Sequence, residues 1–237
     1  MSSELITITN PKSPIAEAYR TLRTNIQFSN VDENLKVLCV TSSGPSEGKT
    51  TTSCNLAETF AQSGKRVLLI DGDLRKPRVH KVFRLSGTKG VTNLLAGQMK
   101  LEEVTHLVGS DLTVIPCGPI PPNPSELLAS KRMKELLDEL KKHYDVIIID
   151  ASPVGVVTDS AILSTIVDGT VLVVASGKTE IENGKRAKQL LENVNARIIG
   201  VVMTMIPVTK NSYYGYQYYS YEEASTPQKK RRRTFLR

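Results

Sequence analysis

Short runs of aliphatic residues alternate along the chain with longer segments in which apolar residues recur every three to four positions. Most of the short runs are unbroken Val, Ile and Leu, which is typical of strands that are covered on both faces. These runs predict strands at Lys36–Thr41, Arg66–Asp71, Leu112–Pro116, Asp145–Asp150, Thr170–Ala175 and Arg197–Thr204.

The longer segments predict helices between those strands. The helices are expected at about Ser13–Phe28, Lys49–Ser63, Lys131–His143, Asp159–Ile166 and Glu180–Val194. Regular alternation of strands and helices is typical of βαβ units, which build parallel sheets with helices on both faces. The pattern therefore predicts a single α/β domain, doubly wound, with a mostly parallel sheet flanked by helices.

Two segments depart from this alternation. Pro116–Pro124 reads PCGPIPPNP, which predicts an extended connection because proline can continue neither a strand nor a helix. A short helix is expected after it, around Ser125–Ser130. From residue 209 onward the apolar periodicity stops and Tyr, Ser, Gln, Lys and Arg dominate. We therefore expect residues 209–237 to form a flexible tail.

Composition excludes several classes of protein. Of the 237 residues, 40% are hydrophobic and 23% are charged, as in an ordinary globular domain. No apolar run approaches the roughly 18 residues of a membrane-spanning helix, and the N-terminus does not read as a secretory signal. The cysteines at positions 39, 54 and 117 are widely spaced, which indicates neither a disulfide framework nor a zinc site. A protein of the reducing cytoplasm is expected.

Positive charge and tyrosine are both concentrated near the C-terminus. The net charge is +7, and Lys229–Arg233 together with Arg237 supply +6 of it. Six of the eight tyrosines lie between positions 213 and 221. The basic run is compatible with attraction to anionic lipid or with a merely solubilising tail. Nucleic acid binding is a third interpretation, which the near-neutral remainder of the chain disfavours.

Residues 41–50 carry the clearest candidate chemistry. They read TSSGPSEGKT and lie between a predicted buried strand and a predicted helix. This is the arrangement of a phosphate-binding P-loop, in which backbone N–H groups meet phosphate oxygens, Lys49 reaches the β- and γ-phosphates and Thr50 ligates Mg²⁺. Ser43 stands where the pattern has its first glycine. The expected nucleotide-binding residues are Gly44, Pro45, Ser46, Glu47, Gly48, Lys49, Thr50 and Thr51.

Acidic residues end two further predicted strands. Asp71 and Asp73 follow the run VLLI, and Asp150 follows VIII. Because the carboxyl ends of parallel strands meet at one edge of the sheet, the three carboxylates are expected beside the P-loop, where they could hold Mg²⁺ directly or through water. Arg75 is compatible with two interpretations, a contact with phosphate or an ion pair with one of these acids.

These motifs resemble those of the bacterial tyrosine kinases associated with capsule and exopolysaccharide synthesis. The resemblance runs from about Ser13 to Tyr221 and includes SGPSEGKT, LLIDGDLR and IIIDASP, together with AEAYRTLRTNI, GPIPPNPSELLAS and the terminal tyrosine cluster. It implies a P-loop fold and transfer of the γ-phosphoryl group of Mg-ATP to tyrosine. The implied catalytic residues are Lys49, Asp71, Asp73 and Asp150, and the implied metal ligands are Thr50, Asp71, Asp73 and Asp150.

A tyrosine hydroxyl, with an ordinary pKa near 10, must lose its proton to a base during transfer, and Asp71 is the first choice with Asp73 as the alternative. The resemblance implies that this happens between subunits of a homo-oligomeric ring. The implied acceptors are Tyr213, Tyr214, Tyr216, Tyr218, Tyr219 and Tyr221. A sticky, β-rich patch is the alternative interpretation of this cluster.

The N-terminal segment carries a charged triplet. Glu17, Arg20 and Arg23 match the ExxRxxR motif of the family, and their helical spacing places them on one face. The resemblance implies a contact between subunits, and a solvated charged face is the alternative. Residues 1–35 are therefore expected to form a helical oligomerisation segment, residues 36–208 the kinase domain and residues 209–237 the tyrosine-rich, basic tail.

The resemblance also implies partners. They are a transmembrane activator of the polysaccharide co-polymerase type, which would hold the cytoplasmic kinase at the inner face of the membrane, and protein substrates phosphorylated on tyrosine. The main alternative function is that of a partitioning or division-site ATPase, a nucleotide-dependent switch without phosphotransfer. It predicts ATP hydrolysis with no modified tyrosine.

Overall fold

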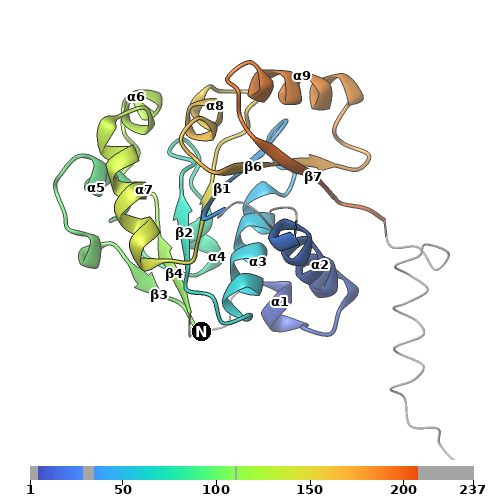
Figure 1. The fold of residues 1–237 in the computed structure, drawn as a ribbon, viewed down its shortest axis with the longest axis horizontal. Helices are drawn as coiled ribbons and strands as arrows, with labels where there is room; N and C mark the ends of the chain where they lie inside the picture. The colour runs from blue at the N-terminus through green and yellow to red at the C-terminus, as the bar shows by residue number, and fades with distance from the viewer. Residues whose placement is uncertain (1–4, 29–34, 110, 208–237) are drawn as a thin grey trace, which may run out of the picture.

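The computed structural model describes residues 5–28, 35–109 and 111–207. Within these ranges a seven-stranded sheet has the order β3-β4-β2-β5-β1-β6-β7, and its pairings are parallel except for that of β3 with β4 (Figure 1). The strands are β1 (Val37–Ser42), β2 (Val67–Asp71), β3 (His106–Leu107), β4 (Leu112–Ile115), β5 (Val146–Asp150), β6 (Gly169–Ala175) and β7 (Ile198–Thr204).

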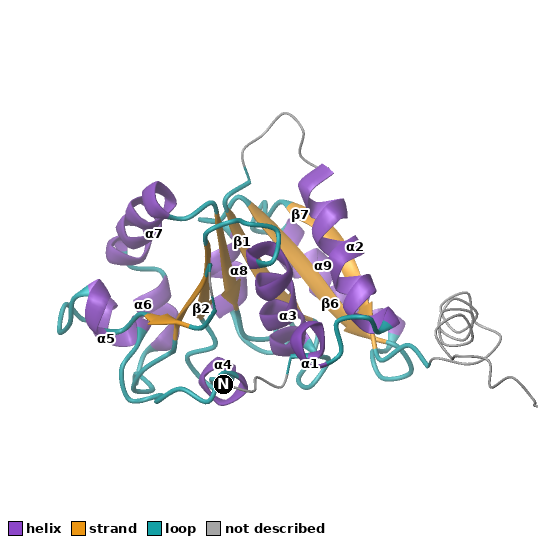
Figure 2. Cartoon of the chain, turned by 90° about the horizontal axis from the view of Figure 1, so that it is seen from below, coloured by secondary structure: helices purple, strands orange, loops and turns teal. Residues whose placement is uncertain are grey.

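Helices cover both faces of this sheet, with α3 and α7 on opposite sides (Figure 2). The helices are α1 (Ile6–Thr9), α2 (Pro14–Phe28), α3 (Lys49–Ala61), α4 (Val79–Val82), α5 (Val91–Leu95), α6 (Pro124–Leu128), α7 (Lys131–His143), α8 (Asp159–Ser164) and α9 (Ile181–Glu192), with a 3-10 turn at Leu101–Glu103. The predicted doubly wound α/β fold is thereby confirmed.

Successive residues of the central strands point to opposite faces, and both faces are buried. In β1, Leu38 and Val40 pack with α3 residues such as Phe60, whereas Val37 and Cys39 pack in the core that includes Leu137 of α7. This explains why β1, β2 and β5 are unbroken aliphatic runs, since neither face meets water.

Strand β7 differs from that pattern because it lies at the edge of the sheet. The expectation that strands are covered on both faces is wrong here: Val201 and Met203 are 58% and 57% exposed. The aliphatic run Ile198–Thr204 does form a strand, paired on one side with β6. A run of aliphatic residues thus predicted the strand correctly but not its position in the sheet.

Most of the elements that the hydrophobic pattern did not predict lie between Gly72 and residue 109, and the short α1 (Ile6–Thr9) is a further one. Helices α4 and α5, the 3-10 turn and β3 are each five residues or shorter, too short for a helical period to repeat. Helix α6 begins at Pro124, at the end of the extended proline-rich connection that was expected. The predicted flexible tail, residues 209–237, lies outside the described residues, as does the tyrosine cluster within it.

Candidate active site

The loop between β1 and α3 reverses direction through residues with left-handed backbone angles. Ser46 has φ of 58° and Gly48 has φ of 90°. Glycine adopts this region without strain, and a side chain at position 48 would also meet Thr204, since a Cβ would lie 3.3 Å from its methyl group. The reversal places the N-terminus of α3, with its unpaired N–H groups, just beyond the end of β1. The local geometry is that of an anion-binding loop.

Lys49 is the first residue of α3 and its side chain is buried between carboxylates. Its Nζ lies 3.0 Å from Asp73 Oδ2 and 3.3 Å from Asp150 Oδ1. The hydroxyl groups of Thr50 and Ser53 also donate to Asp150, at 2.7 Å and 3.0 Å. The structure therefore brings together residues from the P-loop and from the ends of β2 and β5. Ser53 had not been singled out in the sequence.

Asp71 completes the acidic cluster, and it is fully buried. It is the register partner of Asp150 on the adjacent strand. Its Oδ2 accepts the backbone N–H groups of Arg78 and Val79 at 3.1 Å and 3.0 Å, and its Oδ1 has no partner among the described residues. Burial, and then the neighbouring Asp150 carboxylate, raise the pKa of Asp71 to about 8. One of its oxygens is thus available to a ligand.

The charges in this cluster do not balance. Burial raises the pKa of Asp150, whereas Lys49 and the Thr50 hydroxyl lower it. Burial is the larger effect, so the pKa of Asp150 lies above its ordinary value. Burial alone would lower the pKa of Lys49, but the carboxylates of Asp150 and Asp73 outweigh it, so the pKa is raised and the lysine stays charged. One ammonium group therefore faces three carboxyl groups. The cluster can accept further positive charge or protons.

The donor atoms suit Mg²⁺. This ion prefers oxygen ligands and usually takes one or two from protein carboxylates, with waters and substrate phosphates in its other positions. Thr50 Oγ1, Asp73, Asp150 and the unpartnered oxygen of Asp71 are oxygen donors of this kind, and they lie in one cluster. Over the described ranges, no group of three or more His, Cys, Asp or Glu side chains is arranged to hold an ion by itself. The residues present fit an ion that arrives together with a nucleotide.

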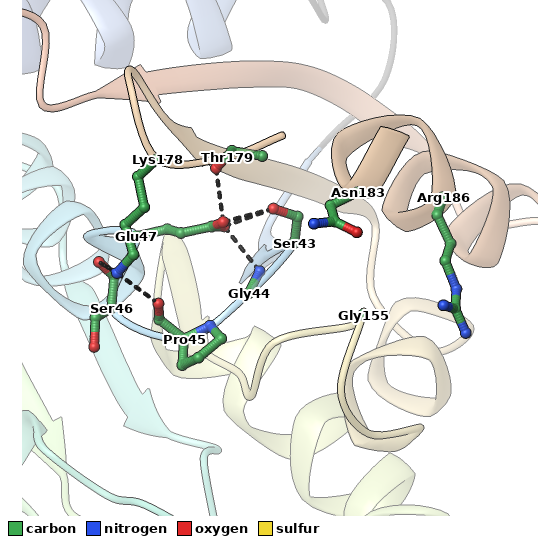
Figure 3. Close-up of a pocket in the computed structure, with 10 residues that line it drawn as sticks. All are labelled: Ser43, Gly44, Pro45, Ser46, Glu47, Gly155, Lys178, Thr179, Asn183 and Arg186. Atoms are coloured by element: carbon green, nitrogen blue, oxygen red, sulfur yellow. Dashed lines mark hydrogen bonds between the residues drawn. The ribbon is translucent and has the colours of Figure 1, made fainter. Parts of the chain in front are cut away.

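The side chain of Glu47, one of the residues predicted to bind nucleotide, folds back and braces the P-loop (Figure 3). Glu47 is 5% exposed, and its carboxylate accepts hydrogen bonds from Ser43 Oγ at 2.7 Å, Gly44 N–H at 2.9 Å and Thr179 Oγ1 at 2.6 Å. The Gly44 N–H is thereby occupied within the protein. Ser43 replaces the first glycine of the pattern and supplies one of these donors.

Lys178 and Thr204, which come much later in the chain, also form hydrogen bonds with the P-loop. Lys178, just after β6, donates from Nζ to the carbonyl oxygens of Pro45 and Ser46 at 3.0 Å and 2.8 Å. Thr204, at the end of β7, donates from Oγ1 to the Glu47 carbonyl at 2.6 Å. Lys178 also lines an open pocket of about 340 Å³ beside the loop (Figure 3). Nothing in the local sequence around Lys178 or Thr204 indicates this contact.

Arg75 forms an ion pair, and its partner is an acid that the sequence analysis did not consider. Its Nε and one terminal nitrogen lie 2.8 Å and 3.1 Å from the two oxygens of Asp159, the fully buried first residue of α8. Ser125 Oγ donates to the same carboxylate at 2.7 Å. Burial would raise the pKa of Asp159, but Arg75 and Ser125 outweigh it and hold the pKa below its ordinary value. We call Arg75, Ser125 and Asp159 the clasp.

The residues of the predicted subunit contact lie along α2, where each arginine has a partner in its own chain. Arg20 pairs with Glu17 at 2.9 Å and donates to the Pro11 carbonyl, and Arg23 donates to the Thr59 carbonyl of α3. The Glu17 side chain is 66% exposed and that of Arg20 30%. Surface remains available at this end of α2.

Known proteins share this sequence pattern. A family model described as an AAA domain matches residues 35–198. Tyrosine-protein kinase YwqD of Bacillus subtilis is 47% identical over 217 residues, which is 91% of this chain and 92% of that protein. The chain belongs to the bacterial tyrosine-protein kinases.

Solved structures of this kinase family share the fold. The kinase domain of the Escherichia coli tyrosine kinase ETK matches with a TM-score of 0.84 and 34% identity, over 90% of this chain and 84% of that one. The chimerical protein CapA2B2 matches with a TM-score of 0.83 and 39% identity, over 86% of this chain and 90% of that one. The resemblance inferred from the sequence is confirmed. The protein is a tyrosine kinase with a P-loop nucleotide-binding fold.

None of the helices in the described ranges of this bacterial tyrosine kinase has the length and apolar character needed to cross a lipid bilayer.

Proposed function

We propose that this kinase transfers the γ-phosphoryl group of Mg-ATP to tyrosines of its own C-terminal segment, residues 213–221. The observation that carries the proposal is the cluster at the start of α3, in which Lys49 Nζ lies 3.0 Å and 3.3 Å from Asp73 and Asp150 beneath an anion-binding loop. Phosphoryl transfer depends chiefly on position and electrostatics, and this cluster provides both.

In the proposed reaction, a tyrosine oxygen attacks the γ-phosphorus while the bond from that phosphorus to the β-γ bridging oxygen breaks and ADP leaves. Lys49 stabilises negative charge on the transferring group. Thr50, Asp73 and Asp150 would hold Mg²⁺, which neutralises charge on the β- and γ-phosphates when bound. The tyrosine proton passes to a carboxylate of the cluster.

Asp71 is the proposed base. Asp73 is already engaged, because its Oδ2 accepts from Lys49 and its Oδ1 accepts the backbone N–H of Lys76. Asp71 keeps Oδ1 without a partner. A carboxylate whose pKa is raised toward the working pH is a stronger proton acceptor than an ordinary one. These contacts favour Asp71 over Asp73.

The test is the intact mass of the protein after incubation with Mg-ATP, with and without subsequent phosphatase treatment. Steps of one phosphate that localise to residues 213–221 and vanish on phosphatase treatment are expected. Lys49→Met serves as the inactive control. ATP hydrolysis with no change in mass would overturn the proposal and favour a partitioning or division-site type of ATPase switch.

We further propose that transfer occurs between subunits of a ring that contact each other through α2. The exposed Glu17–Arg20 pair supports this, since a charged pair at a surface can exchange partners across an interface. The swap Glu17→Arg with Arg20→Glu preserves the pair within the chain and reverses the surface charges. Light scattering should show loss of the oligomer for the swap, whereas the same swap at Glu182 and Lys185 of α9 should leave it intact. An intact oligomer in both variants would contradict this interface.

The proposed setting is capsule or exopolysaccharide synthesis at the inner face of the membrane, with a transmembrane activator as partner. The similarity to kinases named for capsule synthesis supports this assignment. One of them is the putative tyrosine-protein kinase CapB of Staphylococcus aureus, which is 40% identical over 88% of this chain and 92% of that protein. Co-purification of the kinase with membranes only when such an activator is co-expressed is the expected result. Equal membrane recovery without the activator would contradict it.

A further inference from the structure

The region after β2 carries a concentration of positive charge that the net charge of the chain conceals. Between Asp73 and Glu102 there is no acidic residue, and seven lysines and arginines lie there. The remainder of residues 1–208 has a net charge of −5. The near-neutral catalytic body is therefore the sum of one strongly basic stretch and an acidic remainder.

Helix α4 and the loops beside it carry part of this charge. Val79, Val82 and Phe83 pack against the hydrophobic core, whereas Lys81 on the same turn is exposed. Arg78 and Lys81 are three residues apart and both are exposed. Lys76 precedes them on the loop and Lys89 follows, and both are exposed as well. We call Lys76, Arg78, Lys81 and Lys89 the basic face.

The side chains of the basic face are unpaired. Within the described ranges, the side-chain nitrogens of these four residues form no ion pair or hydrogen bond. Arg75, by contrast, is neutralised by Asp159 in the clasp. A group of like charges without counter-ions in the protein is an electrostatic binding surface for an anion.

The basic face begins at the active site itself. The backbone N–H of Lys76 donates to Asp73 Oδ1 at 3.0 Å, and that of Arg78 donates to Asp71 Oδ2 at 3.1 Å. The same short loop thus orients two active-site carboxylates with its backbone and presents cations with its side chains. An anion bound there lies next to the site where phosphoryl transfer is proposed.

We propose that the basic face binds the C-terminal segment 213–223 once its tyrosines are phosphorylated. This rests on the proposed autophosphorylation. Without phosphate, the segment carries only the two charges of Glu222 and Glu223, and residues 209–237 as a whole carry +5. Each phosphotyrosine adds about −1.5 to −2, so three change the charge of residues 213–223 from −2 to about −6.5 to −8, and four reverse the sign of the whole tail. Charge complementarity between this segment and the basic face is therefore much stronger after the reaction than before it.

The phosphorylated segment is favoured over other anions by proximity. It would be produced at the edge of the sheet from which the basic face extends, so its effective concentration there exceeds that of an anion from solution. In an extended chain, Tyr214, Tyr216 and Tyr218 project to the same side about 7 Å apart, so neighbouring phosphates can meet neighbouring cations. Retention of the product tail would then slow entry of the next unmodified tail.

The test measures binding of a synthetic, fluorescently labelled peptide of residues 209–224, with phosphotyrosine at 214, 216 and 218, to the full-length, phosphatase-treated protein. Its affinity should exceed that of the unphosphorylated peptide at least about tenfold and should fall with added salt. Arg78→Glu with Lys81→Glu should weaken binding at least about tenfold. The control, Lys131→Glu with Lys134→Glu on the exposed side of α7, makes the same change in net charge and should have little effect.

Equal affinity for the two peptides, or equal loss in both double variants, would overturn the proposal. Vesicles containing phosphatidylserine test the other occupant. If Arg78→Glu with Lys81→Glu loses vesicle binding but keeps the phosphopeptide affinity, the basic face is a membrane surface and the proposal is wrong. The peptide carries its phosphates from synthesis, so a failure here does not bear on autophosphorylation. Thermal denaturation of both variants checks that they are folded.

Discussion

Two groups of cations and buried carboxylates lie at the same edge of the sheet, and they differ in how fully the carboxylates are neutralised. In the active-site cluster, Lys49 contacts Asp73 and Asp150 while the buried Asp71 keeps an oxygen without a partner. In the clasp, one carboxylate, Asp159, is matched by one guanidinium and by the Ser125 hydroxyl.

The two groups respond to burial in opposite directions. Burial dominates at Asp150 and raises its pKa, whereas at Asp159 the contacts outweigh burial and lower the pKa. Both are aspartates with no exposed surface. The difference indicates which group needs a ligand. A buried carboxylate with a complete set of partners has a structural role. A buried carboxylate with an incomplete set can still bind a cation or accept a proton.

The largest expected effect tests the incomplete group. Lys49→Met should lower the rate of phosphotyrosine formation at least about 100-fold, because it removes the charge that faces the transferring group. Initial rates followed by anti-phosphotyrosine detection or mass spectrometry measure this. Lys178→Met, which removes a cation that contacts only P-loop carbonyls, is the control and should cost less than about tenfold. If both variants lost the rate of phosphotyrosine formation to a similar extent, Lys49 would have no special catalytic role compared with Lys178.

The clasp should show its effect in stability. Asp159→Ala leaves the Arg75 guanidinium and the Ser125 hydroxyl without their shared acceptor, so we expect the free energy of unfolding to fall by about 1–3 kcal/mol. Urea denaturation without nucleotide measures it. Asp145→Ala breaks an aspartate–arginine pair with Arg66 at the surface and should cost about 1 kcal/mol or less. If Asp145→Ala lowered the free energy of unfolding as much as Asp159→Ala, the burial of Asp159 would not explain its contribution to stability.

The clasp also predicts a pH dependence. Because the pKa of Asp159 is lowered in the folded protein, its stabilisation is present above the ordinary carboxyl pKa of about 3.9 and is lost as pH falls through its folded value. The difference in unfolding free energy between the wild type and Asp159→Asn should thus be full at pH 7 and shrink in acid. Chemical denaturation of both proteins between pH 3 and 7 gives this difference. A constant gap across that range would refute an ionic contribution.

The smallest effect concerns the brace of the P-loop. Glu47→Gln keeps the shape of the side chain but removes its charge, which should weaken its bonds to Gly44 and Thr179 and cost about 0.5–1.5 kcal/mol. A rise in KM for ATP that exceeds the fall in kcat is the kinetic result expected of a residue that shapes the loop. The exposed Glu182→Gln is the control. A fall in kcat alone would instead place Glu47 in the chemical step.

The sequence predicted the parts of the molecule that depend on local pattern. The long buried strands and the amphipathic helix α7 are visible in hydrophobic periodicity, and the strand-loop-helix around Lys49 is visible in its motif. The rule that parallel strands align their carboxyl ends was enough to expect Asp71 and Asp150 side by side, and they are register partners.

The remainder depends on contacts between segments far apart in the chain. Asp159 and Arg75 are 84 residues apart, and Thr204 and Glu47 are 157 apart. No spacing or motif indicates which aspartate a given arginine will meet, because the answer depends on how the loops at the strand ends pack. The short α4 was missed for a different reason, since its four residues hold barely one helical turn.

The hydroxyl of Thr204 has a mechanical consequence. Thr204 is the last residue of β7 and holds the carbonyl of Glu47, two positions before Lys49. The substrate tyrosines proposed above follow that strand end along the chain. If a neighbouring molecule held the tyrosine segment, as in the proposed transfer between subunits, the pull would act along the chain toward Thr204 and the Glu47 carbonyl that its hydroxyl holds.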